Sequence, residues 1–378
     1  MNVKKYKIFS ICFVGSFGVA FLATLALVPL LYIYDPLQIY HKPYFREITF
    51  FQDSRIQIKG IIKNYDFDSF IWGTSMLENT LTKEAEQKIS GKWVNISSGG
   101  FALNERAVIL DYMFKNAKPK HIIYSLDIWH LVASHTNDIK NFAFLYDDNK
   151  INDLKIYLNS KTISCALRFS TSENCVGKRD LENLISWLWI KDIGHNARFG
   201  GINKWLENKD NEQIKDTIKE LANMSDSPRY NPKPFTDSIE SNQKYLEENL
   251  LAFVRQNPSV KFSIIIPPYS RLFYRLNDNI YPKAKVILKW LVSQNLPNMK
   301  IYGFDDLPYA DDIANYKDLT HYNVDMNSMQ LDAIANGTHI LTPQNIDSYL
   351  ATMESKIKSY DIAPIIEQIK AWEAQMGQ

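Results

Sequence analysis

The sequence predicts an α/β protein in which a parallel sheet is covered by helices. Short apolar runs, typical of buried strands, alternate with segments whose apolar residues recur at helical spacing. Several of these runs end directly at a glycine, serine or aspartate, as strands do at the edge of a parallel sheet where ligands bind. A polar, Asn- and Lys-rich block, residues 135–255, interrupts the alternation and is expected to be a large, mostly helical insertion.

The bulk composition fits a folded globular protein. The 378 residues suffice for one large domain with an insertion or for two domains. A content of 46% hydrophobic and 22% charged residues excludes a disordered chain. The net charge of +1 gives no indication of a nucleic-acid partner.

The amino terminus has the pattern of a membrane anchor. Residues 1–7 contain three lysines, and residues 8–34 contain no charged side chain. As a helix, this stretch would be roughly 40 Å long, enough to span a bilayer. A cleaved secretory signal is the alternative, but the stretch is longer than a usual signal core and lacks a clear small-x-small site. We expect an uncleaved single-pass anchor in the cytoplasmic membrane, with residues 1–7 in the cytoplasm and the domain on the extracytoplasmic (periplasmic) side.

Residues 35–65 are expected to link this anchor to the domain, which begins with the strand 69–72. Gly73-Thr74-Ser75 ends that strand, and helix-compatible sequence follows from Thr82. A strand, glycine turn, serine and helix in this order can raise a hydroxyl at the carboxyl edge of a sheet. Helix-end N–H groups could then stabilise an oxyanion there. The alternative is a serine that merely caps a helix.

The remaining elements repeat the strand–helix alternation on both sides of the insertion. We expect strands at 92–96, 121–126, 260–266 and 300–304, and helices at 104–115, 183–190, 212–222, 283–294, 325–335 and 346–374. The predicted domain therefore spans residues 66–345, and residues 346–378 form a C-terminal helix.

Two cysteines of the exported part leave two alternatives open. Cys165 and Cys175 are ten positions apart, whereas Cys12 lies in the predicted anchor. In an oxidising compartment the pair could form one local disulfide, and otherwise both would be isolated buried thiols.

Four polar positions fall at the expected carboxyl edge of the sheet. They are Ser75, the glycines Gly99 and Gly100, Asp127, and the pair Asp318 and His321. Nucleophilic acyl transfer needs a hydroxyl, an imidazole, a carboxylate that orients the imidazole, and backbone N–H donors. Here Ser75 is the candidate nucleophile, and Asp318 precedes His321 by three residues on one expected loop.

The combination resembles the SGNH (GDSL-like) hydrolase superfamily over roughly residues 66–130 and 258–340. Gly73-Thr74-Ser75, Gly99 or Gly100, and Asp318-Leu319-Thr320-His321 correspond to its serine, glycine and Asp-x-x-His blocks. The anchor and the Asp-Pro after it also resemble the membrane-anchored branch, which includes the D-alanyl transfer protein of teichoic-acid modification and alginate O-acetylation proteins. The resemblance implies a flavodoxin-like sheet, catalytic Ser75, Asp318 and His321, and an oxyanion hole from the N–H groups of Ser75 and Gly99 or Gly100.

One position departs from this resemblance. The family carries an asparagine that donates to the oxyanion at the end of its third block, where this chain has Asp127. An ionised carboxylate only accepts hydrogen bonds, so Asp127 could instead hold a loop, a substrate or a partner.

Further candidates for substrate contact are His130, Tyr269 and Asn104, with helix capping as the alternative for Asn104. We expect no metal, because no His, Cys or carboxylate cluster has ligand spacing. No phosphate-binding glycine loop is present either, so we expect no cofactor.

The functional hypothesis is an extracytoplasmic acyltransferase or esterase that acts on acyl groups of a cell-surface polysaccharide. A membrane-bound O-acyltransferase and a glycan or acyl-carrier substrate are the partners that the resemblance implies. The alternatives are a non-catalytic accessory protein for that acyltransferase and a plain lipase-like esterase.

Overall fold

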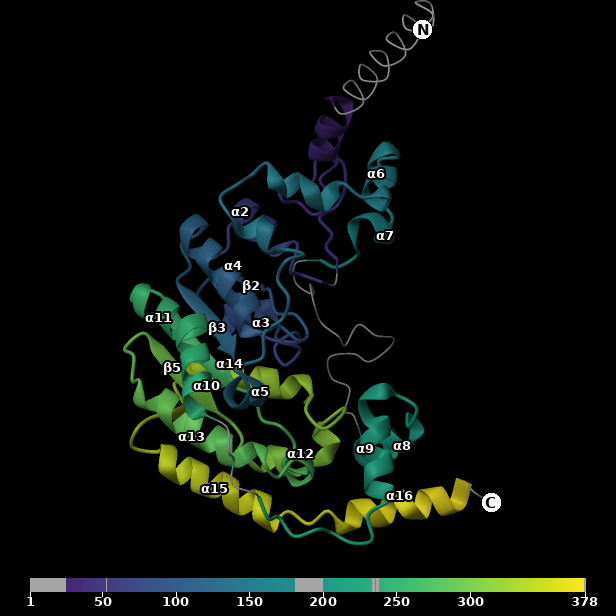
Figure 1. The fold of residues 1–378 in the computed structure, drawn as a ribbon, viewed down its shortest axis with the longest axis vertical. Coiled ribbons are helices and arrows are strands. Elements are labelled where there is room, and N and C mark those ends of the chain that lie inside the picture. The colour runs from purple at the N-terminus through teal and green to yellow at the C-terminus, as the bar shows by residue number, and fades with distance from the viewer. Residues whose placement is uncertain (1–24, 52, 181–199, 233–234, 236–237, 377–378) are drawn as a thin grey trace, which may run out of the picture.

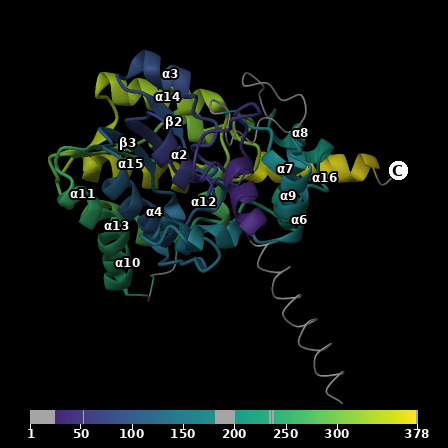
Figure 2. The same ribbon diagram turned by 90° about the horizontal axis from the view of Figure 1, so that it is seen from above.

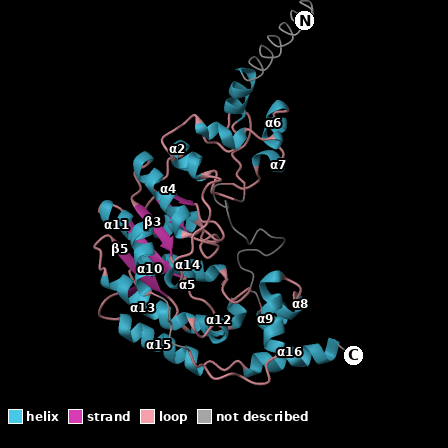
Figure 3. Ribbon diagram, in the orientation of Figure 1, coloured by secondary structure: helices cyan, strands magenta, loops and turns pink. Residues whose placement is uncertain are grey.

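The computed structural model describes residues 25–51, 53–180, 200–232, 235 and 238–376 (Figure 1). A six-stranded sheet lies between layers of helices (Figure 3), in the order β2-β1-β3-β4-β5-β6. The strands are β1 (Ser69–Trp72), β2 (Trp93–Asn95), β3 (His121–Ser125), β4 (Lys261–Ile266), β5 (Met299–Gly303) and β6 (Ile340–Leu341). The predicted α/β class is confirmed. β1 to β5 are parallel, and β6 pairs antiparallel with β5.

Burial explains why these short runs form strands. Every residue of β1, β2 and β3 is buried, and in β4 only Lys261 is exposed. Strands with apolar residues on both faces belong to parallel sheets that are covered on both sides. The five predicted strands are confirmed to within one or two residues, whereas the two-residue β6 has too short a pattern to predict.

The helices cover both faces of the sheet, with α3 and α14 on one side and α4, α10 and α13 on the other (Figure 2). Their bounds are α2 (Ile58–Asn64), α3 (Thr82–Lys88), α4 (Leu103–Asn116), α5 (Ile128–Val132), α6 (Ser160–Leu167), α7 (Glu173–Val176), α8 (Gly201–Glu207), α9 (Glu212–Ala222), α10 (Ile239–Leu246), α11 (Ala252–Gln256), α12 (Arg271–Leu276), α13 (Ile280–Ser293), α14 (Val324–Asn336), α15 (Ile346–Ser359) and α16 (Ala363–Met376).

The strand order places a ligand crevice next to β1. The chain proceeds from β1 to β2 on one side and then to β3 on the other, so the direction of winding reverses there. In open parallel sheets, ligands bind outside the carboxyl ends of the strands at such a reversal.

The block predicted as one insertion divides into three parts. α6 and α7 lie beside the N-terminal segment, where the Tyr34 hydroxyl donates to the Ser170 carbonyl at 2.6 Å. α8 and α9 pack against α16 around Trp205 and Leu221. α10 continues through the π-helical turn η4 (Glu247–Leu251) into α11 and packs on the sheet. The whole block lies between β3 and β4 in sequence, but only this third part has the position of a crossover helix that connects two parallel strands. The predicted helix 183–190 lies outside the described residues.

The C-terminal segment forms two helices rather than the single predicted one. α15 ends at Ser359 and α16 starts at Ala363. Pro364 stands near this break, and proline inside a helix would remove a hydrogen bond and clash with the preceding turn. The Asp361 carboxylate accepts from the Ala363 N–H at 2.9 Å and so starts the second helix.

The segment that follows the predicted anchor is fixed to the domain by Asp35. This buried carboxylate accepts from the backbone N–H groups of Ile39, Tyr40 and His41 at 2.8–3.0 Å and from the Tyr157 hydroxyl. Residues 25–34 are helical, whereas residues 8–24 of the predicted anchor and the tail 1–7 lie outside the described residues. Within the described part of the chain, no helix combines the length and apolar character that a membrane span requires.

A buried ion pair joins α2 to the 3₁₀ turn η2 (Asn152–Tyr157). Lys59 Nζ lies 2.7 Å from both carboxylate oxygens of Asp153, and the two side chains are 4% and 2% exposed. We predict that Lys59→Met lowers the free energy of unfolding by about 3–5 kcal/mol, because Asp153 is left buried without its counter-charge. Chemical denaturation of the purified chain measures this. The double variant Lys59→Met/Asp153→Leu should recover most of the loss, and a double variant as unstable as the single one would contradict the explanation.

Candidate active site

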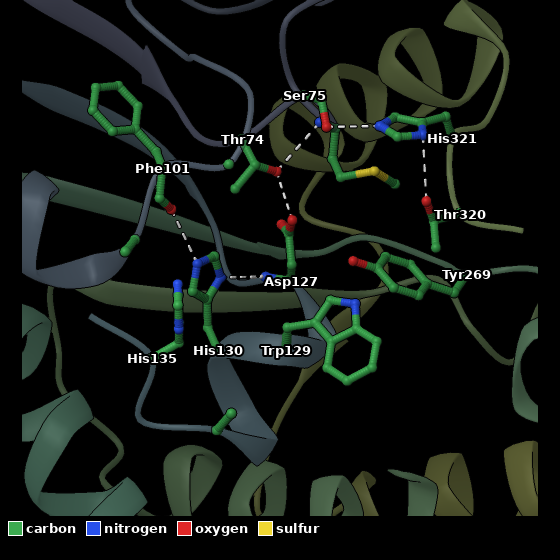
Figure 4. A pocket seen from close by; sticks show the side chains of 14 residues that line it. Thr74, Ser75, Phe101, Asp127, Trp129, His130, His135, Tyr269, Thr320 and His321 are labelled. Carbon is green, nitrogen blue, oxygen red and sulfur yellow. Dashed lines mark hydrogen bonds between the residues drawn. The ribbon is translucent and has the colours of Figure 1, made fainter. Parts of the chain in front are cut away.

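A cavity of about 530 Å³ opens at the carboxyl edge of the sheet, beside the ends of β1 and β3 (Figure 4). It is lined by residues from five separate segments of the chain. They are Thr74, Ser75, Met76, Gly100, Phe101, Ala102, Asp127, Trp129, His130, Ala133, His135, Tyr269, Thr320 and His321.

The turn after β1 presents Ser75 to this cavity. A Cβ on Gly73 would lie 2.4 Å from the Ser125 hydroxyl oxygen, so only glycine fits where β1 and β3 end side by side. The Gly73 N–H donates to the Ser97 hydroxyl at 3.0 Å, and the Thr74 N–H donates to the Ser125 hydroxyl at 3.3 Å. The ends of both neighbouring strands therefore fix the turn.

Ser75 does not cap a helix. Residues 75–79 form turns, and α3 starts only at Thr82. The expectation that a helix terminus stabilises charge at Ser75 is therefore wrong. The residues after Ser75 form turns instead, with hydrogen bonds such as that from the Leu77 N–H to the Thr74 carbonyl at 3.1 Å.

His321 and Asp318 complete a hydrogen-bonded chain with Ser75. Ser75 Oγ lies 2.7 Å from His321 Nε2, and His321 Nδ1 lies 2.7 Å from Asp318 Oδ2. The other carboxylate oxygen of Asp318 accepts from the N–H groups of Thr320 at 2.8 Å and His321 at 2.9 Å. This local turn sets both the position of the imidazole and the tautomer that exposes Nε2 to the serine.

Two buried side chains tie the histidine loop to the serine turn. Tyr322 donates its hydroxyl to the Met76 carbonyl at 2.8 Å, and Asn327 Nδ2 donates to the same oxygen at 2.9 Å. Segments 246 residues apart are thereby held at hydrogen-bond distance.

Charges and hydrogen bonds between Asp318 and His321 shift the pKa values of these two groups in opposite directions. Burial alone would raise the pKa of Asp318, but the charge of His321 and the donors around the carboxylate lower it to about 2. Burial would lower the pKa of His321, but the charge and hydrogen bond of Asp318 outweigh this effect and raise it above its usual value. At neutral pH, Asp318 is therefore ionised, and its charge makes the imidazole of His321 a stronger base than an ordinary histidine.

Only one of the two candidate glycines borders the cavity. The Gly99 N–H donates to the buried Glu78 carboxylate, whereas Gly100 lines the cavity. Gly100 has φ +66°, and a Cβ there would meet nothing within 4 Å, so the backbone conformation alone selects glycine. Gly100 is thus the better candidate for an oxyanion donor.

Asp127 lies beneath the serine turn. Its Oδ2 accepts from the Thr74 hydroxyl at 2.6 Å, while Oδ1 is buried and has no hydrogen-bond partner among the residues that the structure describes. Burial raises the pKa of Asp127 despite the opposing effects of Thr74 and Arg106.

His130 supports the neighbouring backbone. Its Nδ1 accepts from the Asp127 N–H at 3.1 Å, and its Nε2 lies 3.1 Å from the Phe101 carbonyl. Burial, together with the nearby Arg106, holds the pKa of His130 well below its usual value. The imidazole is therefore neutral, and its hydrogen bonds join the loop that follows β2 to the loop that follows β3.

The other predicted contact residues differ in position. Tyr269 lines the cavity and is buried against Phe273. Asn104 does not line it. Instead, Asn104 Nδ2 donates to the Asn137 carbonyl at 2.9 Å, and Oδ1 accepts from the Asn137 N–H at 3.1 Å. This paired contact holds the loop after α5.

Sequence reasoning missed the aromatic wall of the cavity. Trp129 lines it and remains 44% exposed, with its ring set edge-on to Phe273 at 5.7 Å. Its place two residues after Asp127, at a strand end, was the available signal. Thr74 and Thr320 were also missed, since their roles depend on contacts with Asp127 and Asp318.

No group of three His, Cys, Asp or Glu residues that could hold a metal occurs among the residues that the structure describes. No protein-family model and no curated protein sequence matches this chain. The class of the site therefore rests on its geometry, which is that of a serine–histidine–aspartate triad at the mouth of a partly aromatic cavity.

The triad predicts a pH-dependent serine. Because only neutral His321 can accept the Ser75 proton, the rate of labelling by a fluorophosphonate should rise with pH. The rise should have its midpoint above about 6.5, the usual histidine pKa. Asp318→Asn should lower the plateau rate by about 10²–10⁴-fold. It should also move the midpoint to lower pH, because the charge that raises the pKa of His321 is lost.

Time courses of labelling across the pH range measure both effects. Asp332→Asn is a matched control, since it neutralises an exposed carboxylate on α14 that pairs with Lys88. An unchanged plateau in Asp318→Asn would show that the carboxylate does not orient His321.

Proposed function

We propose that this protein is an extracytoplasmic, membrane-anchored SGNH-like acyltransferase or esterase that acts on ester-linked acyl groups of a cell-surface polysaccharide. The observation that carries the proposal is the hydrogen-bonded chain Ser75–His321–Asp318 at the edge of a cavity. Its parts are in the geometry that acyl transfer through a serine requires.

The mechanism follows from the positions of these groups. Ser75 Oγ attacks the acyl carbonyl while His321 Nε2 takes the hydroxyl proton, and Asp318 stabilises the resulting imidazolium. Backbone N–H groups around Ser75 and Gly100 receive the negative charge on the carbonyl oxygen. His321 then protonates the leaving alcohol, which leaves an acyl–Ser75 ester. A glycan hydroxyl or water, deprotonated by His321, takes the acyl group and restores the serine.

The topology of the sheet supports a flavodoxin-like fold of the SGNH type. The order β2-β1-β3-β4-β5 is that of flavodoxin-like sheets. The serine follows β1, the glycine turn follows β2, and the Asp-x-x-His loop lies between β5 and α14. The SGNH type therefore accounts for the order of the functional segments along the chain.

An exposed aromatic ring and a wide cavity support a glycan substrate. Trp129 lines the cavity and is partly exposed, and aromatic rings of this kind stack against sugar rings. A volume of about 530 Å³ is within the range of small-ligand pockets and accommodates an acyl group with part of a sugar.

Features around the N-terminal segment support a membrane location. Exposed apolar residues gather there and include Tyr32, Tyr44, Phe45, Leu167 and Phe169. Several are joined by ring contacts, such as Phe45 with Phe169 at 6.5 Å. Aromatic residues of this kind favour the membrane–water interface.

The adjacent α6–α7 pair also carries a disulfide. Of the two alternatives left open by the sequence, the structure has the bond between Cys165 and Cys175. Disulfides persist in oxidising compartments, which supports an extracytoplasmic domain. A membrane-bound O-acyltransferase that delivers the acyl group is the partner we propose at this end of the molecule.

The test of the proposal is removal of the nucleophile. Ser75→Ala should abolish labelling of the purified protein by a fluorophosphonate. In cells, the same variant should remove the protein's effect on acylation of the surface glycan. Mass spectrometry of the labelled peptide and ester analysis of the glycan provide the two readouts. Two results together would indicate the non-catalytic accessory role instead. The wild-type protein would not be labelled, and glycan acylation in cells would be the same with wild type and with Ser75→Ala.

The aromatic wall gives a second prediction. Trp129→Ala should raise the KM for an oligosaccharide substrate about 3- to 10-fold, because a stacking surface is lost. Trp129→Phe should retain most of the affinity. Steady-state kinetics on the oligosaccharide and on a small chromogenic ester separate binding from chemistry. An equal loss on both substrates would argue against stacking on a sugar.

A further inference from the structure

The glycine turn after β2 contains one peptide group that can take two orientations. The Phe101 N–H donates to the Ser98 carbonyl at 3.2 Å, and Gly100 has φ +66°. This hydrogen bond and a positive φ at the second central residue are those of a type II β-turn. A type I turn differs from it by a rotation of the central peptide, and glycine at that position permits both. Contacts from outside the turn therefore decide which orientation is populated.

The central peptide consists of the Gly99 carbonyl and the Gly100 N–H, the proposed oxyanion donor. Because a peptide group is planar and trans, these two groups point in opposite directions. A rotated peptide would present the carbonyl oxygen where the N–H had been. The oxyanion would then meet the negative end of a dipole instead of a hydrogen-bond donor.

Arg55 holds the carbonyl side of this peptide. Its Nη2 donates to the Gly99 carbonyl at 3.2 Å, and its Nη1 donates to the Ser98 hydroxyl oxygen at 3.2 Å. Its Cζ also lies 4.3 Å from the centroid of the Phe101 ring. Arg55 is 44 positions before Gly99 in the chain and precedes α2, so these contacts form only on folding.

Glu105 and Asn137 fix the guanidinium and the turn in place. Glu105 is 3% exposed, and its carboxylate accepts from Arg55 Nε at 2.7 Å and from the Ala102 N–H at 2.8 Å. Asn137 Nδ2 donates to the Glu105 carboxylate at 2.7 Å and to the Gly100 carbonyl at 3.1 Å. Because the donors of a guanidinium form a rigid planar fork, the carboxylate on one edge determines where the other donors point.

We infer that Arg55 is a positioning residue, which holds the peptide between Gly99 and Gly100 in the orientation in which the Gly100 N–H donates to the oxyanion. This inference rests on the proposed function of Ser75. Arg55 acts on the reaction through the turn alone. Its charged hydrogen bond to the carbonyl also polarises the peptide, which makes the N–H a stronger donor.

Two substitutions change the orientation of the peptide by different routes. Arg55→Met keeps an unbranched side chain but removes the donors to the Gly99 carbonyl. In Gly100→Ala the Cβ would meet nothing within 4 Å, but a side chain disfavours φ +66°, so the rotated peptide is favoured. If both act through one rotation, the double variant should label within about threefold of the slower single variant, because the effects are not independent.

The experiment measures saturation kinetics of fluorophosphonate labelling on the full-length protein and its variants, with thermal unfolding as the check of folding. Arg55→Met should lower the maximal rate constant about 10- to 100-fold, which approaches the loss of one oxyanion donor. The half-saturating concentration should stay within about twofold, since the lost interaction belongs to the transition state. The pH midpoint should not move, because the groups that shift the pKa of His321 are Asp318, Lys317 and Glu78.

Two matched controls separate the turn from general effects of charge. Asp53→Asn neutralises a 60% exposed carboxylate that pairs with Arg55 Nη1 at 3.4 Å. Arg255→Met removes an exposed arginine on α11 that pairs with Glu247. Both should label at the wild-type rate. A crystal structure of Arg55→Met should contain the rotated peptide, with a negative φ at Gly100.

The inference would be overturned by a folded Arg55→Met variant that labels at the wild-type rate, or by an unrotated peptide in its crystal structure. Equal slowing in Asp53→Asn, or slowing in the double variant equal to the product of the two single effects, would overturn it as well. Wild-type labelling that persists in Ser75→Ala would instead refute the proposed function of Ser75, while the crystal structure still tests the peptide. The two failures are therefore distinguishable.

Discussion

The close approach of β1 and β3 at Gly73 is the constraint on which the site depends. The Ser125 hydroxyl occupies the space that a side chain at position 73 would need. The same hydroxyl accepts from the Thr74 N–H and so fixes the turn that presents Ser75. Since neighbouring parallel strands lie less than 5 Å apart, a residue larger than glycine would displace this turn. A shift of even about 1 Å at a reactive group can cost about 10² in rate.

Electrostatics then divides three ionisable groups into different roles. Asp318 is held ionised by backbone donors and by His321, and the charge of Asp318 in turn keeps the His321 imidazole basic. Asp127 lies on the other side of the serine turn, where burial works against its charge. The pKa values of the two carboxyl groups near Ser75 are thus shifted in opposite directions, because one is surrounded by N–H donors and the other has a single hydroxyl donor.

Much of the fold and of the triad could be predicted from local sequence. Buried strands are continuous apolar runs, so β1, β3 and β4 stood out, and Gly73, Ser75 and Asp318-x-x-His321 mark strand ends and loops by their residue types. The break before α16, the two-residue β6 and the division of the helical block could not be read in this way. Each of them depends on packing partners distant in sequence, as α9 with α16 shows.

The parallel sheet, the residues of the triad and the uncharged stretch 8–34 follow from the sequence alone, because periodicity, glycine and charge are local properties of the chain. Which residues share the cavity depends on how distant segments pack. Trp129 and Gly100 line it, whereas Asn104 does not, and the Gly99 N–H donates to Glu78 instead. One oxygen of Asp127 has no hydrogen-bond partner within the described part of the chain. The physical reason is that hydrogen-bond partners and burial are set by segments that meet only after folding.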